Sequence, residues 1–336
     1  VWVNCTNQFD ARAGFGGMRA SGSGRESGRE GCLEYLKWVA PATRTAGLKS
    51  PPAKAKSSAG PDRTHKLYIG GKQVRPDGGG ALSLPLVEGG VAEGGRGNRK
   101  DIRNAVEVAD AAASTWSKTT GYARAQILYF LAENMEEARS SLEHALVARG
   151  QSPAEAQAEV KAAIAALGMA AAWADKFEGT VHPVPQRALC YTRPEALGTV
   201  GVVLPDESPL LAAAVACGAA LAMGNSVVCL PSRHNPLPVL ELMRIMEASD
   251  IPGGVWNVVT GELSEVLPAL AEHDGVASVW CFGEESACFD VEKASVGNLK
   301  QTWCLGGKKL DWVSAPYGEF LRRATQVKNV WVPYGS

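Results

Sequence analysis

The sequence has few of the features that would assign a class of protein at once. Its eight cysteines, at positions 5, 32, 190, 217, 229, 281, 288 and 304, include no Cys-x-x-Cys pair. That spacing is typical of zinc sites and redox motifs, so the cysteines are expected to be reduced core residues, not ligands or a disulfide framework. The five histidines, at positions 65, 144, 182, 234 and 273, are equally dispersed, and we predict no metal site.

Neither charge nor a long apolar run indicates a nucleic acid or a membrane as partner. The net charge is only −1, and a chain without a basic excess is not expected to bind either surface by charge. The longest apolar stretch, around Leu210–Met223, is interrupted by Gly218 and is too short to span a bilayer. No signal peptide opens the chain, so we expect a cytoplasmic protein; because it starts at Val1 instead of Met, we expect a fragment.

The second half of the chain has the pattern of an α/β fold. Thr199–Leu204 and Ser226–Leu230 are short β-branched runs of the kind found in buried parallel strands, and the apolar helix Leu210–Met223 lies between them. Strand–helix alternation of this length predicts a doubly wound parallel sheet with right-handed crossovers. The alternation continues with a helix, Leu237–Ser249, and two more strands, Gly254–Val259 and Ala277–Cys281.

The preceding segments are predicted to be mostly helical. Asp101 is expected to open a helix, since an acidic residue suits the positive N-terminal end. We predict two long helices, Tyr122–Arg149 and Pro153–Phe177, and a short helix over Cys32–Trp38. The glycine-rich stretch Gly78–Gly95 lacks the Lys-Ser/Thr ending of a phosphate-binding loop and is predicted to be a plain loop.

Residues 304–308, Cys-Leu-Gly-Gly-Lys, resemble the Glu-Leu-Gly-Gly-Lys signature of the aldehyde dehydrogenase family. Leu197–Leu210 resembles the first nucleotide-domain strand of that family and its following loop, and Ala219–Pro231 resembles the next helix and strand. The fold implied is a doubly wound parallel sheet like the family's NAD domain. Two further segments, Thr180–Glu195 and Thr325–Pro333, resemble the family's oligomerisation flap.

Residues 1–42 resemble the carboxyl end of the same family, through Val-Trp-Val-Asn-Cys and the small residues that follow Phe15. The resemblance therefore implies a two-module protein with a degenerate second module, similar to the family 16 type. We expect four segments: residues 1–42, the C-terminal tail of a preceding module; 43–66, a basic Pro/Ala/Ser-rich flexible linker; 67–310, a degenerate NAD-domain-like module; and 311–336, a C-terminal oligomerisation strand.

The positions that match the family's catalytic groups carry other residues. Cys304 stands where the family has its general-base Glu, and Glu207 stands where it has the Asn that stabilises the oxyanion. A carboxylate repels an oxyanion. A cysteine at an apolar strand end without a base is expected to be inert, which disfavours a repositioned nucleophile. No cysteine follows Cys304, so the family's nucleophile has no counterpart, and we expect no catalytic residue in this segment.

The positions that match cofactor contacts are changed as well. Leu230 and Arg233 replace the Lys and Glu that hold the adenosine ribose in the family. The pyrophosphate turn Gly-Ser-Thr-x-x-Gly here runs from Gly283 through Glu284 and Glu285 to Cys288. Partly buried glutamates ~4–6 Å from a pyrophosphate, at an effective dielectric of ~20, would each repel it by on the order of several kcal/mol. Micromolar binding amounts to ~8 kcal/mol. We therefore expect no cofactor here, and NAD or NADP only through the missing first module.

Three functions stay open. The first is a non-catalytic module with a structural role, in which flap and tail pair edge strands in a homodimer and residues 1–42 dock by strand addition. The second is support for an NAD(P)-dependent aldehyde dehydrogenase whose active site, in the first module, oxidises aldehydes to carboxylic acids. The third is a protein-interaction platform that uses the vestigial cleft between Pro205 and Gly283.

Overall fold

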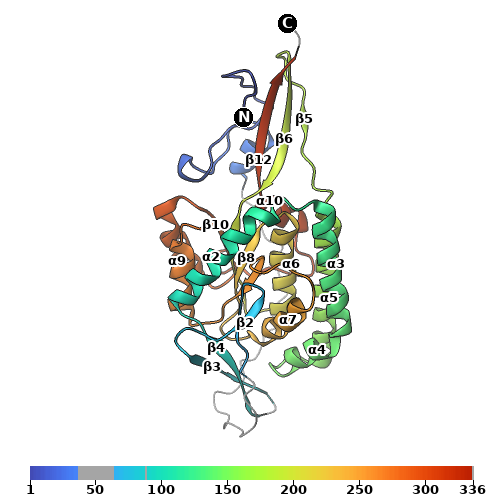
Figure 1. Cartoon of the computed structure of the whole chain (residues 1–336), viewed down its shortest axis with the longest axis vertical. Helices are drawn as coiled ribbons and strands as arrows, with labels where there is room; N and C mark the ends of the chain where they lie inside the picture. Colours follow the sequence, from blue (N-terminus) through green and yellow to red (C-terminus); the bar gives the residue numbers. More distant parts are fainter. Residues whose placement is uncertain (37–63, 88, 335–336) are drawn as a thin grey trace.

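A seven-stranded sheet forms the centre of the protein (Figure 1). The computed structural model describes residues 1–36, 64–87 and 89–334, and its central strands lie in the order β11-β10-β7-β8-β9-β1-β2. The first five are parallel, whereas β1 pairs antiparallel with β9 and with β2. The bounds are β1 Leu67–Ile69, β2 Lys72–Val74, β7 Thr199–Val203, β8 Ser226–Leu230, β9 Trp256–Val258, β10 Val276–Cys281 and β11 Gln301–Cys304. The predicted α/β sheet is confirmed; its antiparallel extension through β1 and β2 was not predicted.

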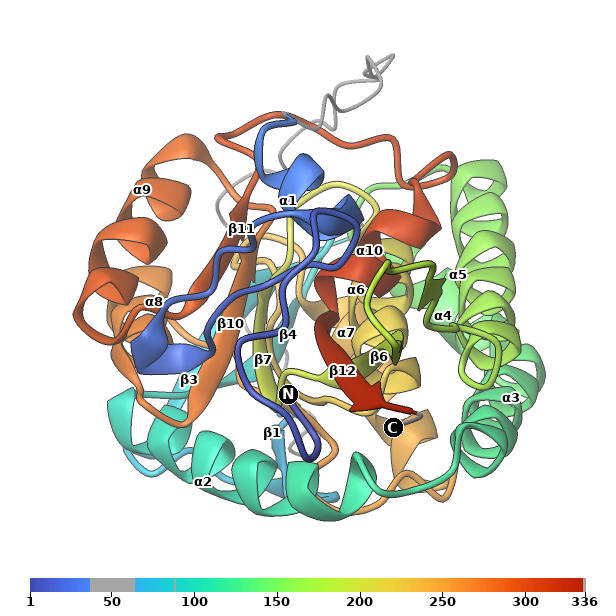
Figure 2. The same cartoon turned by 90° about the horizontal axis from the view of Figure 1, so that it is seen from above.

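Helices cover both faces of this sheet (Figures 1 and 2). On one face, the side chains of α2, α8 and α9 share an apolar core with Val228, Val279 and Cys281. On the other face, α3 to α7 and α10 share a larger core with Val202 and Trp280. The helices are α2 Arg99–Trp116, α3 Gly121–Glu137, α4 Arg139–Val147, α5 Pro153–Trp173, α6 Pro209–Ala222, α7 Leu237–Glu247, α8 Leu263–Glu272, α9 Glu285–Ser295 and α10 Tyr317–Arg323.

Helix α6 is the most completely enclosed element, because all fourteen of its residues are buried. It is apolar around its whole circumference, as expected for a helix packed against a sheet on one side and other helices on the rest. Pro209 occupies its first turn, where a missing N–H costs nothing. The predicted bounds, Leu210–Met223, are wrong by one residue at each end.

A separate three-stranded antiparallel sheet projects from the body of the molecule (Figure 1). It consists of β5 Val181–His182, β6 Ala188–Ala196 and β12 Thr325–Pro333, with β6 in the middle. The bounds of β12 agree with the predicted tail strand. We call this sheet the flap. It joins two segments that are far apart in the sequence, as the resemblance implied.

Residues 1–36 lie against the flap (Figure 1). Val3 N–H donates to Trp331 O at 2.9 Å and Trp331 N–H donates to Val1 O at 3.0 Å, which makes a parallel bridge between Trp2 and Trp331. Ala13 is buried with Cys190 and Trp331 of the flap. The expected strand addition is therefore present, but it is limited to one bridge.

Two helix predictions are wrong in their extent. The predicted helix Tyr122–Arg149 is interrupted at Ala138, whose φ of −90° and ψ of 11° lie outside the helical region, so α3 and α4 are separate. No Gly or Pro marks this break. The predicted helix over Cys32–Trp38 is α1, Gly28–Glu34, which begins four residues earlier. Trp38 and most of the predicted linker, residues 43–63, lie outside the described residues.

The glycine-rich stretch Gly78–Gly95 forms a hairpin, and the prediction of a plain loop is wrong. β3, Gly80–Pro85, pairs antiparallel with β4, Val91–Arg96, in register from one end to the other. The side chains of Leu82 and Leu84 are buried. Burial of each such side chain contributes about 1.5–3 kcal/mol, which outweighs the weak strand propensity of glycine.

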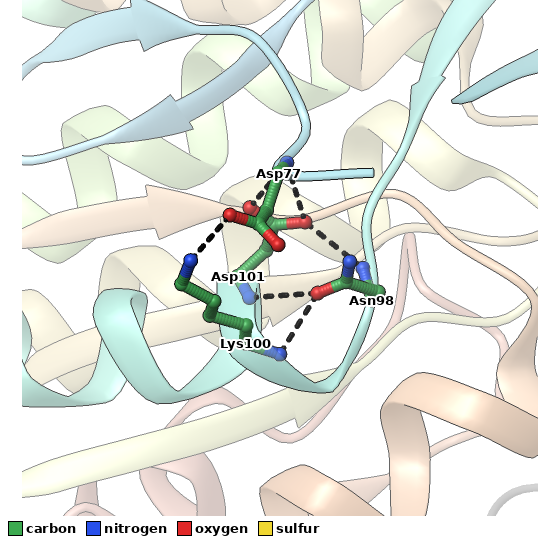
Figure 3. A network of polar contacts seen from close by, with 4 residues as sticks. All are labelled: Asp77, Asn98, Lys100 and Asp101. Carbon is green, nitrogen blue, oxygen red and sulfur yellow. Dashed lines mark hydrogen bonds and ion pairs between the residues drawn. The ribbon is translucent and has the colours of Figure 1, made fainter. Parts of the chain in front are cut away.

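Helix α2 begins two residues before Asp101, so the prediction that Asp101 opens it is wrong. Asn98 is the N-cap, and its side chain accepts from the backbone N–H of Lys100 at 2.8 Å and of Asp101 at 3.2 Å. The Asp101 carboxylate accepts in return from Asn98 N–H at 3.0 Å (Figure 3), which completes a capping box. It also accepts from Asp77 N–H at 3.1 Å, and thus fixes the chain before the hairpin. Within the described residues, no helix is long and apolar enough to cross a membrane.

Candidate functional site

A cleft of about 850 Å³ lies at the carboxyl ends of the parallel strands. This is the edge at which ligands bind in open α/β sheets, because the strand-to-helix loops diverge there. The loops after β7, β8, β10 and β11 all contribute to its lining. Its lining includes Arg149, Glu207, Arg233, Glu262, Glu284 and Gly307.

The first loop of the cleft carries Glu207, the residue at the family's oxyanion-donor position. Its carboxylate forms an ion pair with the ammonium of Lys309, which lies across the cleft. The next residue, Ser208, has a left-handed φ of 45° and makes no side-chain cap at the start of α6. Glu207 thus faces a cation of the protein itself, and the loop presents no amide donor to the cleft from this position.

The two ribose-contact positions after β8 are separated in the structure. Leu230 is 1% exposed and packs into the core on the α2 side, so its side chain does not line the cleft. Arg233 does line the cleft, but its guanidinium donates to the carboxylate of Glu262 at 3.0 Å and forms an ion pair with it at 2.9 Å. This hydrogen bond holds the pKa of Glu262 below its usual range. No feature of the sequence indicated Glu262 as the partner of Arg233.

Gly283 and Glu284 lead into α9, as the sequence predicted. Glu284 is the N-cap residue of that helix, and neither Glu284 nor Glu285 makes a side-chain capping bond. Both are exposed, which contradicts the partial burial assumed for them. In a dielectric near ~80 a charge at ~4 Å contributes only about 1 kcal/mol, so the predicted repulsion of a pyrophosphate is too large.

The Gly306–Gly307 turn lies directly against the start of α9. Both glycines have positive φ, 59° and 73°. A Cβ added to Gly307 would lie 3.0 Å from the backbone nitrogen of Glu285. The turn therefore needs glycine both for its backbone angles and for its close approach to the helix. This explains physically why the two glycines of the signature are present although the carboxylate before them is not.

Cys304 ends β11, as predicted, and is partly buried. Cys281 and Cys288 lie beside it, although the three cysteines are separated in the sequence. Hydrogen bonds with the Cys281 and Cys288 thiols, together with burial, raise the pKa of the Cys304 thiol above its usual range. A group with this pKa is a poor general base near neutral pH. The pairing of Cys281 with Cys304 follows from the parallel ladder of β10 and β11, which the sequence did not specify.

Arg149 is a cleft residue that the sequence did not single out. It is only 8% exposed, and its guanidinium donates to the carbonyl oxygens of Pro85 and His234. Burial and the nearby Arg233 lower its pKa. It holds the β3–β4 hairpin against the loop after β8. Within the described part of the chain, no group of three His, Cys, Asp or Glu residues is placed to hold a metal ion.

The chain was compared with known proteins. The model of the aldehyde dehydrogenase family matches residues 1–40 and 84–315. Cytosolic 10-formyltetrahydrofolate dehydrogenase of Xenopus tropicalis is 31% identical over 258 residues, which cover 73% of this chain and 28% of that protein. Retinaldehyde dehydrogenase 3 of Rattus norvegicus is 30% identical over 252 residues, which cover 72% of this chain and 49% of that protein.

A solved structure shares the fold as well. The NAD+ complex of an aldehyde dehydrogenase from Bacillus cereus aligns with a TM-score of 0.69 at 28% identity, covering 72% of this chain and 50% of that one. The chain thus spans about half of the length of these proteins, or less. The shared fold, the signature around Gly306 and the family match over most of the sequence agree with one another. The chain belongs to the aldehyde dehydrogenase family.

Proposed function

We propose that this chain is a non-catalytic member of the family, which serves assembly and not aldehyde oxidation. The observation that carries the proposal is the internal charge pairing of its cleft. Glu207 faces Lys309, and Arg233 is bound to Glu262. In each pair, the group that could meet a ligand is already engaged by an opposite charge of the protein. The thiol of Cys304 adds a poor base at the position of the family's carboxylate.

NAD or NADP does not fit these residues well. A pyrophosphate or a ribose phosphate needs free cations or amide donors, whereas the exposed end of α9 carries Glu284 and Glu285. To bind a phosphate, Arg233 would have to leave Glu262, and the ion pair and hydrogen bond between them would be lost. The proposal therefore includes no bound cofactor in this segment.

The flap supports the assembly role. Across its strands, Val181, Tyr191 and Val330 are register partners, as are Leu189 and Val332, so these side chains share one face. This face is opposite to the one that residues 1–15 cover. Val181 is 65% exposed and Leu189 is 44% exposed on it. An exposed apolar row on a projecting sheet is typical of a protein–protein contact, and we propose a homodimer formed through it.

The alternative is a supporting role in an NAD(P)-dependent aldehyde dehydrogenase whose active site lies in another module. It is favoured by the resemblance of residues 1–42 to a family carboxyl end and by the NAD+ complex of the Bacillus cereus relative. A role as an interaction platform for other proteins, through the cleft, is compatible with either proposal. We further propose a cytoplasmic location and no nucleic-acid or membrane partner.

Isothermal titration calorimetry with NAD+ and with NADP+ tests the central point. The wild-type chain should show no binding tighter than about 1 mM, an affinity that corresponds to roughly 4 kcal/mol. The variant Glu262→Gln frees Arg233 and should bind NADP+ better than the wild type does. The control Glu265→Gln, which removes a carboxylate that pairs with Arg96 one helical turn further along, should behave as the wild type. Micromolar binding of either dinucleotide by the wild type would refute the proposal.

A further inference from the structure

Three cysteines from three elements meet beside the wall of the cleft. Cys281 ends β10 and Cys304 ends β11, and the two are Cα partners across the parallel ladder. Cys288 lies in the first turns of α9, which packs over the ends of both strands. The sulfur of Cys304 is 3.8 Å from the carbonyl oxygen of Cys288, and the sulfur of Cys288 is 3.6 Å from the carbonyl oxygen of Cys281. The three thiols also hydrogen-bond with one another.

The surroundings of Cys288 favour its thiolate. The backbone N–H groups of Gly306 and Gly307 donate to its sulfur, as do the thiols of Cys281 and Cys304, and these bonds lower its pKa against the opposing effect of burial. Its place near the N-terminal end of α9 acts in the same direction, because the helix dipole favours an anion there. These surroundings favour the thiolate at Cys288, with the thiols of Cys281 and Cys304 and the Gly306–Gly307 turn as its donors.

The three sulfurs differ in their access to solvent. Cys304 is partly exposed on β11, which is an edge strand of the central sheet, whereas Cys288 is 3% exposed and Cys281 is 0% exposed. A small oxidant therefore reaches Cys304 first, and Cys288 is the neighbour that can attack it from inside. An accessible cysteine beside a second cysteine that can resolve it is an arrangement that redox-sensitive sites use.

We propose that Cys288 and Cys304 form a reversible disulfide when the protein meets a hydroperoxide. The Cys304 thiol gives its proton to the Cys288 thiolate and its sulfur attacks one peroxide oxygen; the O–O bond breaks, a sulfenic acid forms on Cys304, and the leaving hydroxide takes a proton from solvent and departs as water. The Cys288 sulfur then attacks the Cys304 sulfur. The S–O bond breaks and the hydroxyl leaves as a second water with the proton of Cys288. Two thiols lose two electrons and one H2O2 is reduced to two waters.

The positions of these two cysteines support a common role. Both stand where the chain departs from the family's motifs: Cys288 at the last glycine of the pyrophosphate turn and Cys304 at the general-base position. They are 16 residues apart in the sequence, yet the fold places them in contact. Their bond would tie the first turns of α9 to the end of β11, and both elements adjoin the cleft. The inference does not depend on whether that cleft binds a dinucleotide.

Peptide mapping by mass spectrometry tests the proposal. The purified full chain is treated with graded H2O2, its remaining thiols are alkylated under denaturing conditions, and it is digested without reductant. We expect one cross-linked peptide pair that contains Cys288 and Cys304, and dithiothreitol should remove it. In Cys288→Ser, Cys304 should accumulate as a sulfenic acid that dimedone traps. Cys281→Ser should keep the cross-link.

The chain contains its own control. Cys217 and Cys229 are also in contact, but both are 0% exposed in the other core, so they should stay reduced throughout the titration. The exposed Cys32 reports the background reactivity of an isolated thiol. The proposal is overturned if Cys304 proceeds directly to sulfinic acid, if it pairs with Cys281, or if Cys32 is oxidised before the trio. Because the wild-type map alone decides between these outcomes, the test does not depend on the folding of a variant.

Discussion

At the scale of single residues, Glu159 shows how a buried charge is accommodated. It is 7% exposed in α5, and its carboxylate accepts from the backbone N–H of Leu210 at 2.9 Å and of Leu211 at 3.3 Å, at the start of α6. The amide of Gln151 donates to its other oxygen at 2.6 Å. Burial raises the pKa of Glu159 in spite of these three hydrogen bonds. The buried α6 therefore depends on a carboxyl group from a neighbouring helix for its N-terminal cap.

The raised pKa of Glu159 predicts the sign of a pH effect. A carboxyl group whose folded pKa lies above its unfolded value binds more protons in the native state, so the free energy of unfolding falls as the pH rises from about 4.5 through the folded pKa. Each pKa unit corresponds to roughly 1.4 kcal/mol. Glu159→Gln removes the titrating group and should flatten this decline, which urea denaturation at several pH values measures. The Gln151 amide can turn its unpaired oxygen toward the new donor, so the variant keeps this hydrogen bond.

Two further variants control this prediction. Glu155→Gln, in the capping box of the same helix, removes a group whose pKa is lowered by hydrogen bonds from Ser152. Its contribution has the opposite sign: it is present above the unfolded pKa and is lost as the pH falls through the folded pKa. Glu159→Ala should cost at least about 2 kcal/mol at every pH, because it leaves two buried N–H groups without an acceptor. A pH profile of Glu159→Gln that follows the wild type would contradict the assignment.

Of all features of the candidate site, the contacts of each side chain were the least predictable from the sequence. The resemblance identified Glu207, Arg233 and Cys304 as changed positions, but not what each of them faces. Lys309 lies 102 positions from Glu207, and Glu262 lies 29 positions from Arg233. A pattern of residue types contains no information on such pairs until the sheet order is known. The cysteine trio was missed for the same reason.

At the scale of elements, the start of α2 was predicted at Asp101, three residues after its actual N-cap, Asn98. Asn98 is a stronger N-cap candidate than Asp101, since Asn is among the preferred N-cap residues and an acidic residue at the third helical position completes the box. Asn98→Ala should lower the free energy of unfolding by about 1 kcal/mol, within a range of about 0.5–2 kcal/mol. Urea denaturation measures this loss.

Thr120→Ala is the matched control for this prediction. Thr120 caps α3 through one hydrogen bond only, to Ala123 N–H at 3.2 Å, and no residue returns the bond. Its removal should therefore cost less than the removal of Asn98, which holds two N–H groups and is tied to Asp77 through Asp101 (Figure 3). An equal or larger effect of Thr120→Ala would show that the reciprocal box adds nothing.

The elements that the sequence predicted best are those with an unbroken apolar pattern. β8 has the predicted bounds because all five of its residues are buried and four of them form a continuous apolar run after Ser226. The hairpin of β3 and β4 was missed since its glycines gave no strand signal, and two buried leucines determine it. Tertiary packing decides such weak segments.

At the scale of the whole molecule, the uncovered flap face predicts the oligomeric state. Size-exclusion chromatography with light scattering should give a mass of twice 35.4 kDa at micromolar concentration. Leu189→Asp places a charge in the middle of the exposed apolar row and should shift the mass to that of one chain. Val296→Asp, at a 70% exposed position after α9 and outside the flap, should leave the dimer intact. A wild-type chain that is monomeric at every concentration would refute the assembly proposal.

The ion pairs across the cleft have a consequence for the mutational history of this chain. A single change that restores the family residue at Glu207 removes the carboxylate that Lys309 faces. A single change at Glu262 leaves the guanidinium of Arg233 without its carboxylate. Each of these single changes therefore removes a favourable contact and leaves the other changed positions of the cleft as they are. Because the charges are paired, a cleft with the family's residues would require several substitutions together.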